Sequence, residues 1–360
     1  MGTKALIVEV LENLWSKNKA KGLLAQAVLM QEISKGVFGE DAGDKIFSGC
    51  WLLAPKSTDF YKFRFCFFVH PSVLKLHDAG VTPKSILGDK YRPFHAITEF
   101  MDNAGIGTVY VVPSTDNGKL PLESFKNRNF SGIAWQLFTF ENGEFISREP
   151  QEFFTRWAGN RGRASSGTQW EPQTKEKIGL LNEEILTELL LNELFLSGFV
   201  KSILRKPLND PYDVDSFLIS ISQNHIFPME IKEKFPGQNS KDKFFGIDAG
   251  RVMMLLRLCL PNDANSVYLI RELDETGQFI GWKYITLSDI VMTSSWNLQA
   301  GGPGMGGQST QTIRLPYEYF KDFIANEITE DNLKKIGNLP KDVKTIAKQF
   351  GAELLSKFHR

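Results

Sequence analysis

Two short apolar runs, each with acidic residues at one end, constrain the fold of this chain most strongly. Residues 211–234 read PYDVDSFLISISQNHIFPMEIKEK. The run FLIS follows Asp213 and Asp215, and the run IFPM leads into Glu230 and Lys232. Each run has the length of a buried strand. Fifteen positions separate Asp215 from Glu230, which is enough for the two predicted strands to form a hairpin.

The spacing of Glu230 and Lys232 predicts that both side chains lie on one face of the second strand, with Ile231 pointing into the core. Mg²⁺ binds hard oxygen ligands, usually one or two carboxylates with water and substrate phosphate. Acids on neighbouring strands, with a cation beside them, are what metal-dependent phosphodiester hydrolysis needs. The alternative is a surface hairpin with solvated charges, and the apolar residues that flank Glu230 and Lys232 count against it.

Helices are predicted on both sides of this hairpin. The segment KEKIGLLNEEILTELLLNELFLSGF is dense in Leu and Ile and is predicted as a helix that ends near Gly198. FFGIDAGRVMMLLRLCL is predicted as a second long helix, and SVYLIRELD and WKYITL as further strands. The order helix, strand, strand, helix, strand predicts a mixed sheet flanked by helices.

This order of elements, a helix, a strand led by an acid, a strand with Glu230 and Lys232 and then a helix, resembles the PD-(D/E)XK nuclease superfamily. It is most like the type II restriction endonucleases of that superfamily. In that family an acid begins one strand and a (D/E)-x-K triplet lies on the next, as in DVDSFL and MEIKEK here. The resemblance covers roughly residues 175–260. It implies an α/β (α+β) fold with a restriction-endonuclease-like mixed sheet flanked by helices in the carboxy-terminal part. No proline directly precedes the acid, so Asp213 stays an alternative to Asp215.

The resemblance also implies roles for individual residues. The catalytic positions are Asp215, Glu230 and Lys232, with Glu183 or Glu184 as a further acid on the preceding helix. The positions that hold Mg²⁺, or Mn²⁺ as a substitute, are Asp215, Glu230 and Ile231. The implied substrate is double-stranded DNA, cut by a homodimer whose two active sites match a two-fold symmetric target. A companion DNA methyltransferase in the host is implied as well.

Residues 1–155 are predicted to form a separate mixed α and β domain that recognises DNA. Two helices are expected within residues 5–36, separated by KNKAKG. Strands are expected in FYKFRFCFFVH and TVYVVP, with the helix HAITEFMDNAG between them. Asn142 and Gly143 predict a hairpin turn in IAWQLFTFENGEFI. No catalytic motif is found in this part of the chain.

The segment RWAGNRGRASSGTQW, residues 156–170, is rich in Gly and Ser and has three arginines and no acid. It is either a solvated linker or a basic arm whose guanidinium groups hold phosphates or read guanine edges. Residues 171–360 would then form the nuclease domain. The predicted DNA-binding residues are Arg156, Arg161, Arg163, Lys234 and Arg251.

Composition excludes several other classes of protein. The 42 Lys and Arg balance the 42 Asp and Glu, so a nucleic-acid enzyme of this composition needs a local basic cleft. Cys50, Cys66 and Cys259 form no CxxC pair, which predicts neither disulfides nor a zinc site. The amino terminus has the pattern of an amphipathic helix, and no apolar run reaches about 18 residues. We therefore expect a cytoplasmic protein without membrane contact.

Two alternatives to a restriction enzyme stay open. One is a repair or defence nuclease without sequence specificity, and the other is a non-catalytic DNA-binding protein of the same fold. A resolvase of the superfamily is typically much smaller. The presence of Asp215, Glu230 and Lys232 together favours an enzyme over a binding protein.

Overall fold

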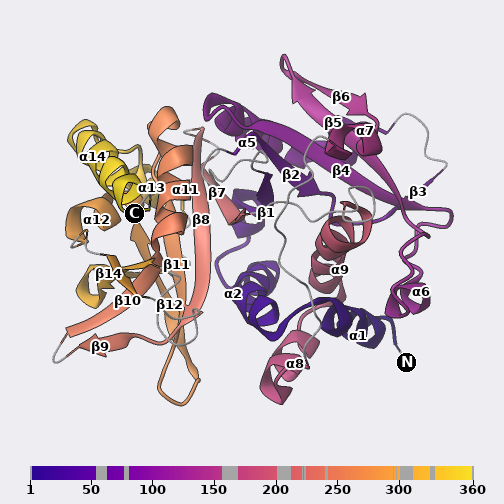
Figure 1. The fold of residues 1–360 in the computed structure, drawn as a ribbon, viewed down its shortest axis with the longest axis horizontal. Helices are drawn as coiled ribbons and strands as arrows, with labels where there is room; N and C mark the ends of the chain where they lie inside the picture. The colour runs from indigo at the N-terminus through magenta and orange to yellow at the C-terminus, as the bar shows by residue number, and fades with distance from the viewer. Residues whose placement is uncertain are drawn as a thin grey trace. The chain divides into compact units, whose positions relative to one another are not determined.

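The computed structural model describes residues 2–53, 63–76, 81–155, 169–200, 212–220, 222, 224–239, 242–294, 296, 298–300, 311–324 and 329–358. The chain divides into two compact units. The first comprises Met1–Lys35 and Gly49–Asp213, and the second comprises Gly36–Ser48 and Val214–Arg360. Each unit contains both helices and strands (Figure 1).

The first unit has a mixed sheet with the strand order β1-β2-β4-β5-β6, and the short β3 also pairs with β4. Strands β2 and β3 are parallel to β4, and the other pairs are antiparallel. The strands are β1 (Ile46–Leu53, of which Gly49–Leu53 belong to this unit), β2 (Phe65–Val69), β3 (Leu74–Lys75), β4 (Gly107–Thr115), β5 (Ala134–Glu141) and β6 (Glu144–Arg148). The helices are α1 (Thr3–Leu14), α2 (Lys17–Ser34), α4 (Pro83–Leu87), α5 (Tyr91–Asn103), α6 (Leu122–Lys126), α7 (Pro150–Thr155), α8 (Pro172–Gly179) and α9 (Glu183–Glu193), which continues as a π-helix over Leu194–Val200.

The two helices expected at the amino terminus are confirmed, but the break between them lies earlier than KNKAKG. The hydroxyl of Ser16 accepts the backbone N–H of Lys19, and this cap starts α2 at Lys17. KNKAKG therefore forms the first turns of α2. The predicted hairpin is also confirmed, because Asn142 and Gly143 join β5 to β6 with φ angles of 52° and 85°.

The single helix expected before Gly198 is wrong, because two helices occupy this segment. The chain leaves α8 after Gly179, and the side chain of Asn182 caps α9 by accepting the N–H of Ile185 at 2.9 Å. An asparagine at this place offers the backbone a local bond that competes with a continuous helix. Leucines of α9 and of its π-helical continuation lie in the buried core of the first unit.

The second unit has two sheets, with strand orders β15-β12-β11-β8-β7 and β13-β14-β10-β9. In the larger sheet β8 and β11 are parallel, and the other pairs are antiparallel. The strands are β7 (Tyr212–Ser220), β8 (His225–Lys234), β9 (Gly237–Asn239), β10 (Asp242–Asp248), β11 (Val267–Leu273), β12 (Phe279–Thr286), β13 (Leu298–Ala300), β14 (Gln311–Pro316) and β15 (Lys321–Asp322). The helices are α3 (Ala42–Lys45), α11 (Ala249–Cys259), α12 (Leu287–Thr293), α13 (Glu330–Ile336) and α14 (Lys341–Phe358). The expected mixed sheet flanked by helices is present (Figure 1).

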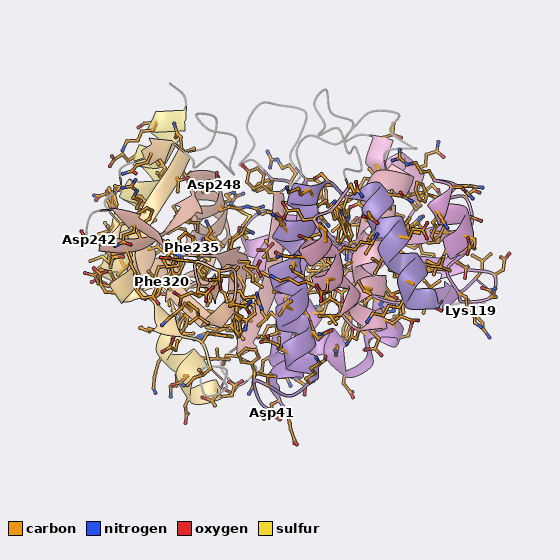
Figure 2. All side chains as sticks on the ribbon, turned by 90° about the horizontal axis from the view of Figure 1, so that it is seen from below. Asp41, Lys119, Phe235, Asp242, Asp248 and Phe320 are labelled. Atoms are coloured by element: carbon orange, nitrogen blue, oxygen red, sulfur yellow. The ribbon has the colours of Figure 1, made fainter. Side chains whose placement is uncertain are left out.

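The helix expected to start at FFGID begins five residues later, because this pentapeptide is the end of β10. The two ends of β10, Asp242 and Asp248, are labelled in Figure 2. Pairing with β14 brings Gly246 so close to Thr312 that a Cβ atom at Gly246 would lie 2.7 Å from its methyl carbon. The side chain of Asp248 then caps α11 by accepting the N–H of Gly250 at 2.8 Å.

The boundary between the units lies after Asp213, whereas the sequence suggested a boundary within residues 156–170. Residues 171–213 belong to the first unit, with α8 and α9. None of the helices in the described part of the chain is long and apolar enough to cross a membrane.

Candidate active site

The hairpin of β7 and β8 places two acids at the same level of the sheet. The antiparallel register runs from Ser220 opposite His225 to Ser216 opposite Met229. Asp215 directly precedes this paired stretch on β7, and Glu230 directly follows it on β8. The Oδ2 atom of Asp215 accepts the backbone N–H of Ile231 at 2.6 Å. This side-chain bond holds the Asp215 carboxylate against β8.

Lys232 connects the two acids. Its Nζ atom lies 3.1 Å from Oδ2 of Asp215 and 2.8 Å from Oε1 of Glu230. Glu230 and Lys232 therefore share one face of β8, as their spacing predicted, and the side chain of Ile231 is buried. An acid from one strand and an acid–lysine pair from the next thus meet at one place.

The two carboxylates are almost fully removed from water, whereas the lysine is not. The exposed fractions are 4% for Asp215, 1% for Glu230 and 28% for the side chain of Lys232. Burying a carboxylate is costly unless it is paired. Lys232 and Arg251 supply the opposite charge, the latter with Nε 3.4 Å from Oε1 of Glu230. The two cations are the members of this group that solvent reaches, with the side chains of Lys232 and Arg251 28% and 22% exposed.

Glu230 is held mainly by the charges of Lys232 and Arg251. Within the described residues neither of its carboxylate oxygens has a hydrogen-bond donor in acceptable geometry. Buried polar atoms in folded proteins are normally bonded. Oε1 is in ion-pair contact with Lys232 and Arg251, whereas Oε2 has no hydrogen-bond donor among the described residues and offers its lone pairs to a small hard cation.

The site offers few protein ligands for a metal. The described residues contain no cluster of three or more His, Cys, Asp or Glu side chains that could hold a metal ion. Asp215 and Glu230 would therefore supply two carboxylate ligands, and main-chain, water or substrate oxygens would have to supply the others. That composition is the usual one for Mg²⁺ in proteins that act on phosphates.

Two charged groups beside the site have altered pKa values. Burial, with the charge of Lys232 acting in the same direction, lowers the pKa of Lys234 to about 8. Its Nζ atom donates to the carbonyl of Gly246 at 2.7 Å, so this predicted DNA ligand reaches toward the protein. Burial raises the pKa of Asp248, and the charge of Glu230 adds to that effect.

Tyr268 is a member of this neighbourhood that the sequence did not single out. The parallel register of β8 and β11 places it beside Glu230. Its hydroxyl donates to the carbonyl of Gly246 at 2.9 Å. Burial and the charges of Glu230 and Asp215 raise its pKa well above the usual value. SVYLIRELD was correctly predicted as a strand, but nothing in the sequence gives the register that brings Tyr268 to Glu230.

The other predicted site residues are distributed differently. Glu183 and Glu184 form the exposed first turn of α9 in the first unit, and their role stays a prediction. The buried acid of α9 is Glu193, which accepts the indole N–H of Trp15 at 2.8 Å and an ammonium hydrogen of Lys19. Arg156, Arg161 and Arg163 lie outside the described residues, so their role also stays a prediction.

A scan against models of protein families, a search of curated proteins and a search of solved structures each found no match. The geometry around Asp215, Glu230 and Lys232 is therefore the basis for a functional interpretation.

Proposed function

We propose that this protein is a magnesium-dependent, sequence-specific endonuclease of double-stranded DNA, a type II restriction enzyme of the PD-(D/E)XK superfamily. The observation that carries the proposal is the position of Lys232, within 3.1 Å of Asp215 and 2.8 Å of Glu230 on adjacent strands. A surface hairpin with solvated charges would leave these acids in water, whereas both are buried.

The residues fit a hard divalent cation. Asp215 and Glu230 would hold it through carboxylate oxygens, together with the main-chain carbonyl of Ile231. When bound, Mg²⁺ or Mn²⁺ would act as a Lewis acid at the phosphate and would lower the pKa of a coordinated water molecule. Cation binding would also relieve the repulsion between two buried carboxylates, which Lys232 and Arg251 balance in the structure.

The chain's own groups would contribute charge and position. Lys232 is partly exposed, so its ammonium can reach a phosphate oxygen or the attacking water at the surface of the site. A fixed positive charge there stabilises the negative charge that develops on the phosphate as a water oxygen bonds to phosphorus and a P–O ester bond breaks. Asp215 keeps the lysine in place through the contact at 3.1 Å.

DNA binding would use cations beside this centre. Arg251 lies in the first turn of α11 next to Glu230 and is proposed to contact phosphate. The arginines at 156, 161 and 163 are proposed to add further phosphate contacts, and Lys234 would add one by releasing the carbonyl of Gly246. The first unit would recognise the DNA sequence. Cutting both strands of a palindrome would require a homodimer, with a companion methyltransferase protecting host DNA in the cytoplasm.

One observation favours a second candidate, a DNA-binding protein that keeps the fold without the chemistry. Lys232 and Arg251 already neutralise the buried acids, so the cluster is stable as an ion-pair network without a metal. In that case the site would contribute to folding only.

Incubation of unmethylated DNA with the full chain and Mg²⁺ separates these candidates. Discrete fragments are expected for the sequence-specific enzyme. A smear would instead indicate a repair or defence nuclease, and intact DNA that is nevertheless bound would indicate the binding protein. Asp215→Ala serves as the inactive control in the same preparation, so that a contaminating nuclease is detected.

A further inference from the structure

A cavity of about 360 Å³ lies within the first unit and is lined only by residues of that unit. Its walls come from the end of α6, the segment 128–133, the start of β5 and the π-helix after α9. This volume is in the range of small-molecule sites in proteins.

Aromatic rings form two of the walls. Phe125 and Phe130 pack with ring centroids 5.8 Å apart, and Trp135 and Phe199 with centroids 5.9 Å apart. The neighbouring Gly198 lets Phe130 approach, because a Cβ atom there would lie 3.2 Å from its ring. Flat aromatic faces beside an open volume are the usual platform for stacking a nucleic-acid base.

The rim of the cavity is polar and carries a positive charge. Arg128, Asn129 and Ser131 are exposed and line it. The Nη2 atom of Arg128 donates to the carbonyl of Asn13 at 3.1 Å. None of the ion pairs among the described residues involves Arg128, and its exposed guanidinium is open to an anion beside the aromatic walls. Guanidinium groups bind phosphate oxygens well.

The backbone at this rim has an uncommon conformation. Arg128 has a φ of 57°, in the left-handed region that residues other than glycine rarely adopt. Its own N–H donates to the carbonyl of Phe125 at 2.9 Å, which holds the turn. Backbone strain of this kind is often found at ligand sites. Here it places a charged side chain at the mouth of an aromatic cavity.

We infer that this cavity binds a single nucleobase that has left the stack of a DNA strand, with Arg128 at the phosphate of the same nucleotide. This inference rests on the proposed function and assigns part of DNA recognition to the first unit. A nucleotide satisfies both features at once, because its base fills the aromatic space and its phosphate neutralises the guanidinium. An apolar side chain of a protein partner would leave that charge uncompensated.

The test compares two labelled single strands of equal length, one with bases and one abasic, both bound by the full chain in the presence of a chelator so that nothing is cut. We expect the strand with bases to bind about tenfold more tightly. Phe199→Leu or Trp135→Leu should remove most of that difference. Equal binding of the two strands by the wild-type chain, or failure to bind either, would overturn the inference.

The contribution of the charge is tested with Arg128→Asn, because asparagine tolerates the left-handed backbone. We expect this variant to bind both strands more weakly, by the same factor, and to lower the slope of log affinity against log salt by about 0.7. Arg92→Asn, which makes the same charge change at an exposed position of α5, should leave the slope unchanged. A slope for Arg128→Asn equal to that of the wild type would contradict the assignment of the phosphate.

Photochemical cross-linking of a strand that contains 5-iododeoxyuridine tests the site in the wild-type chain. The result therefore does not depend on a variant that could misfold. Cross-links to Phe130, Trp135 or Phe199 are expected, and cross-links found only elsewhere would refute the cavity. None of these assays uses cleavage. If the chain cuts DNA with Mg²⁺ but cross-links elsewhere, the inference alone fails, whereas base-dependent binding without cutting contradicts the proposed nuclease.

Discussion

The Nζ atom of Lys232 lies 3.1 Å from the Oδ2 atom of Asp215, although the two residues are 17 positions apart in the chain. The contact depends on the antiparallel pairing of β7 with β8, which brings the start of one strand to the end of the other. Because Asp215 also accepts the N–H of Ile231, its carboxylate is fixed before any substrate binds. Such preorganisation is what an electrostatically assisted hydrolysis requires.

Replacing either partner of this contact should abolish cutting and keep binding. We expect Asp215→Ala and Lys232→Ala to lower the cleavage rate by about 100-fold or more. DNA affinity should change little, because it comes mainly from contacts to phosphates and bases. Single-turnover cleavage and a gel-shift titration on the same preparation measure the two quantities.

Glu233→Gln is the matched control on the same strand. Glu233 lies on the opposite face of β8 and forms an ion pair with Arg271 at 2.6 Å. This variant should cut at nearly the wild-type rate. If Glu233→Gln were as inactive as Lys232→Ala, a general loss of β8 structure would explain both results.

The sequence predicted much of this site because its signals are local. Alternation along a strand is enough to place Glu230 and Lys232 on one face, and fifteen positions allow the turn back to Asp215. The apolar residues that flank Glu230 and Lys232 counted against a solvated surface hairpin, and Glu230 is buried. Asp215 is the candidate aspartate whose carboxylate lies 3.1 Å from Lys232, and its role at a metal stays a prediction.

Other features depend on pairing between distant segments, which sequence patterns do not encode. Tyr268 reaches Glu230 only through the parallel register of β8 and β11. FFGID has a helix-like pattern, but pairing with β14 makes it a strand. One missed feature is local: Asn182 divides a leucine-rich segment that looks like one helix, because its side chain caps α9. Tertiary pairing and capping decided these cases, and propensity alone did not.

Glu230 should be needed for the binding of a divalent cation, independently of cutting. A cation that binds only the folded chain raises its stability by mass action, about 2.7 kcal/mol at 100 times its Kd. We therefore expect Mg²⁺ or Mn²⁺ to raise the Tm of the wild-type chain by several degrees, and Glu230→Gln to lose this shift. Calorimetric melting at constant ionic strength makes the measurement. An equal shift in both proteins would place the cation elsewhere.

His70 should make stability depend on pH in the acid range. Its ring is buried between Tyr110, at 2.7 Å, and Ser72, at 2.8 Å, and burial lowers its pKa from 6.5 to about 4. The unfolded chain takes up the proton first as pH falls, so the free energy of unfolding decreases between pH 6.5 and pH 4. Across this range the free energy of unfolding of the wild-type chain should fall by up to about 3 kcal/mol more than that of His70→Gln.

Urea unfolding of both proteins at several pH values between 7 and 4 measures this difference. If the free energies of unfolding of wild type and His70→Gln differed by the same amount at every pH, His70 would have the same pKa in the folded and unfolded chains. The comparison with the variant removes the contributions of other titrating groups, because these are common to both proteins.

The arginines at 156, 161 and 163, in the segment outside the described residues, should neutralise DNA phosphates. Replacing all three with Ala should weaken binding of duplex DNA and reduce the slope of log affinity against log salt by about 0.9 for each phosphate that is no longer neutralised. Affinity measured across a series of salt concentrations gives the slope. A slope equal to that of the wild type would assign this segment to a plain linker.

The rate of DNA cutting as a function of divalent cation tests the proposed mechanism most directly. Two carboxylates, a carbonyl and water form a hard oxygen site, so we predict cutting of unmethylated duplex DNA with Mg²⁺ or Mn²⁺ and none in excess chelator. Ca²⁺, which is larger and accepts irregular coordination, should support binding without cutting. Cutting at an undiminished rate in excess chelator would contradict the metal-dependent site at Asp215 and Glu230, and with it the resemblance to the PD-(D/E)XK nucleases.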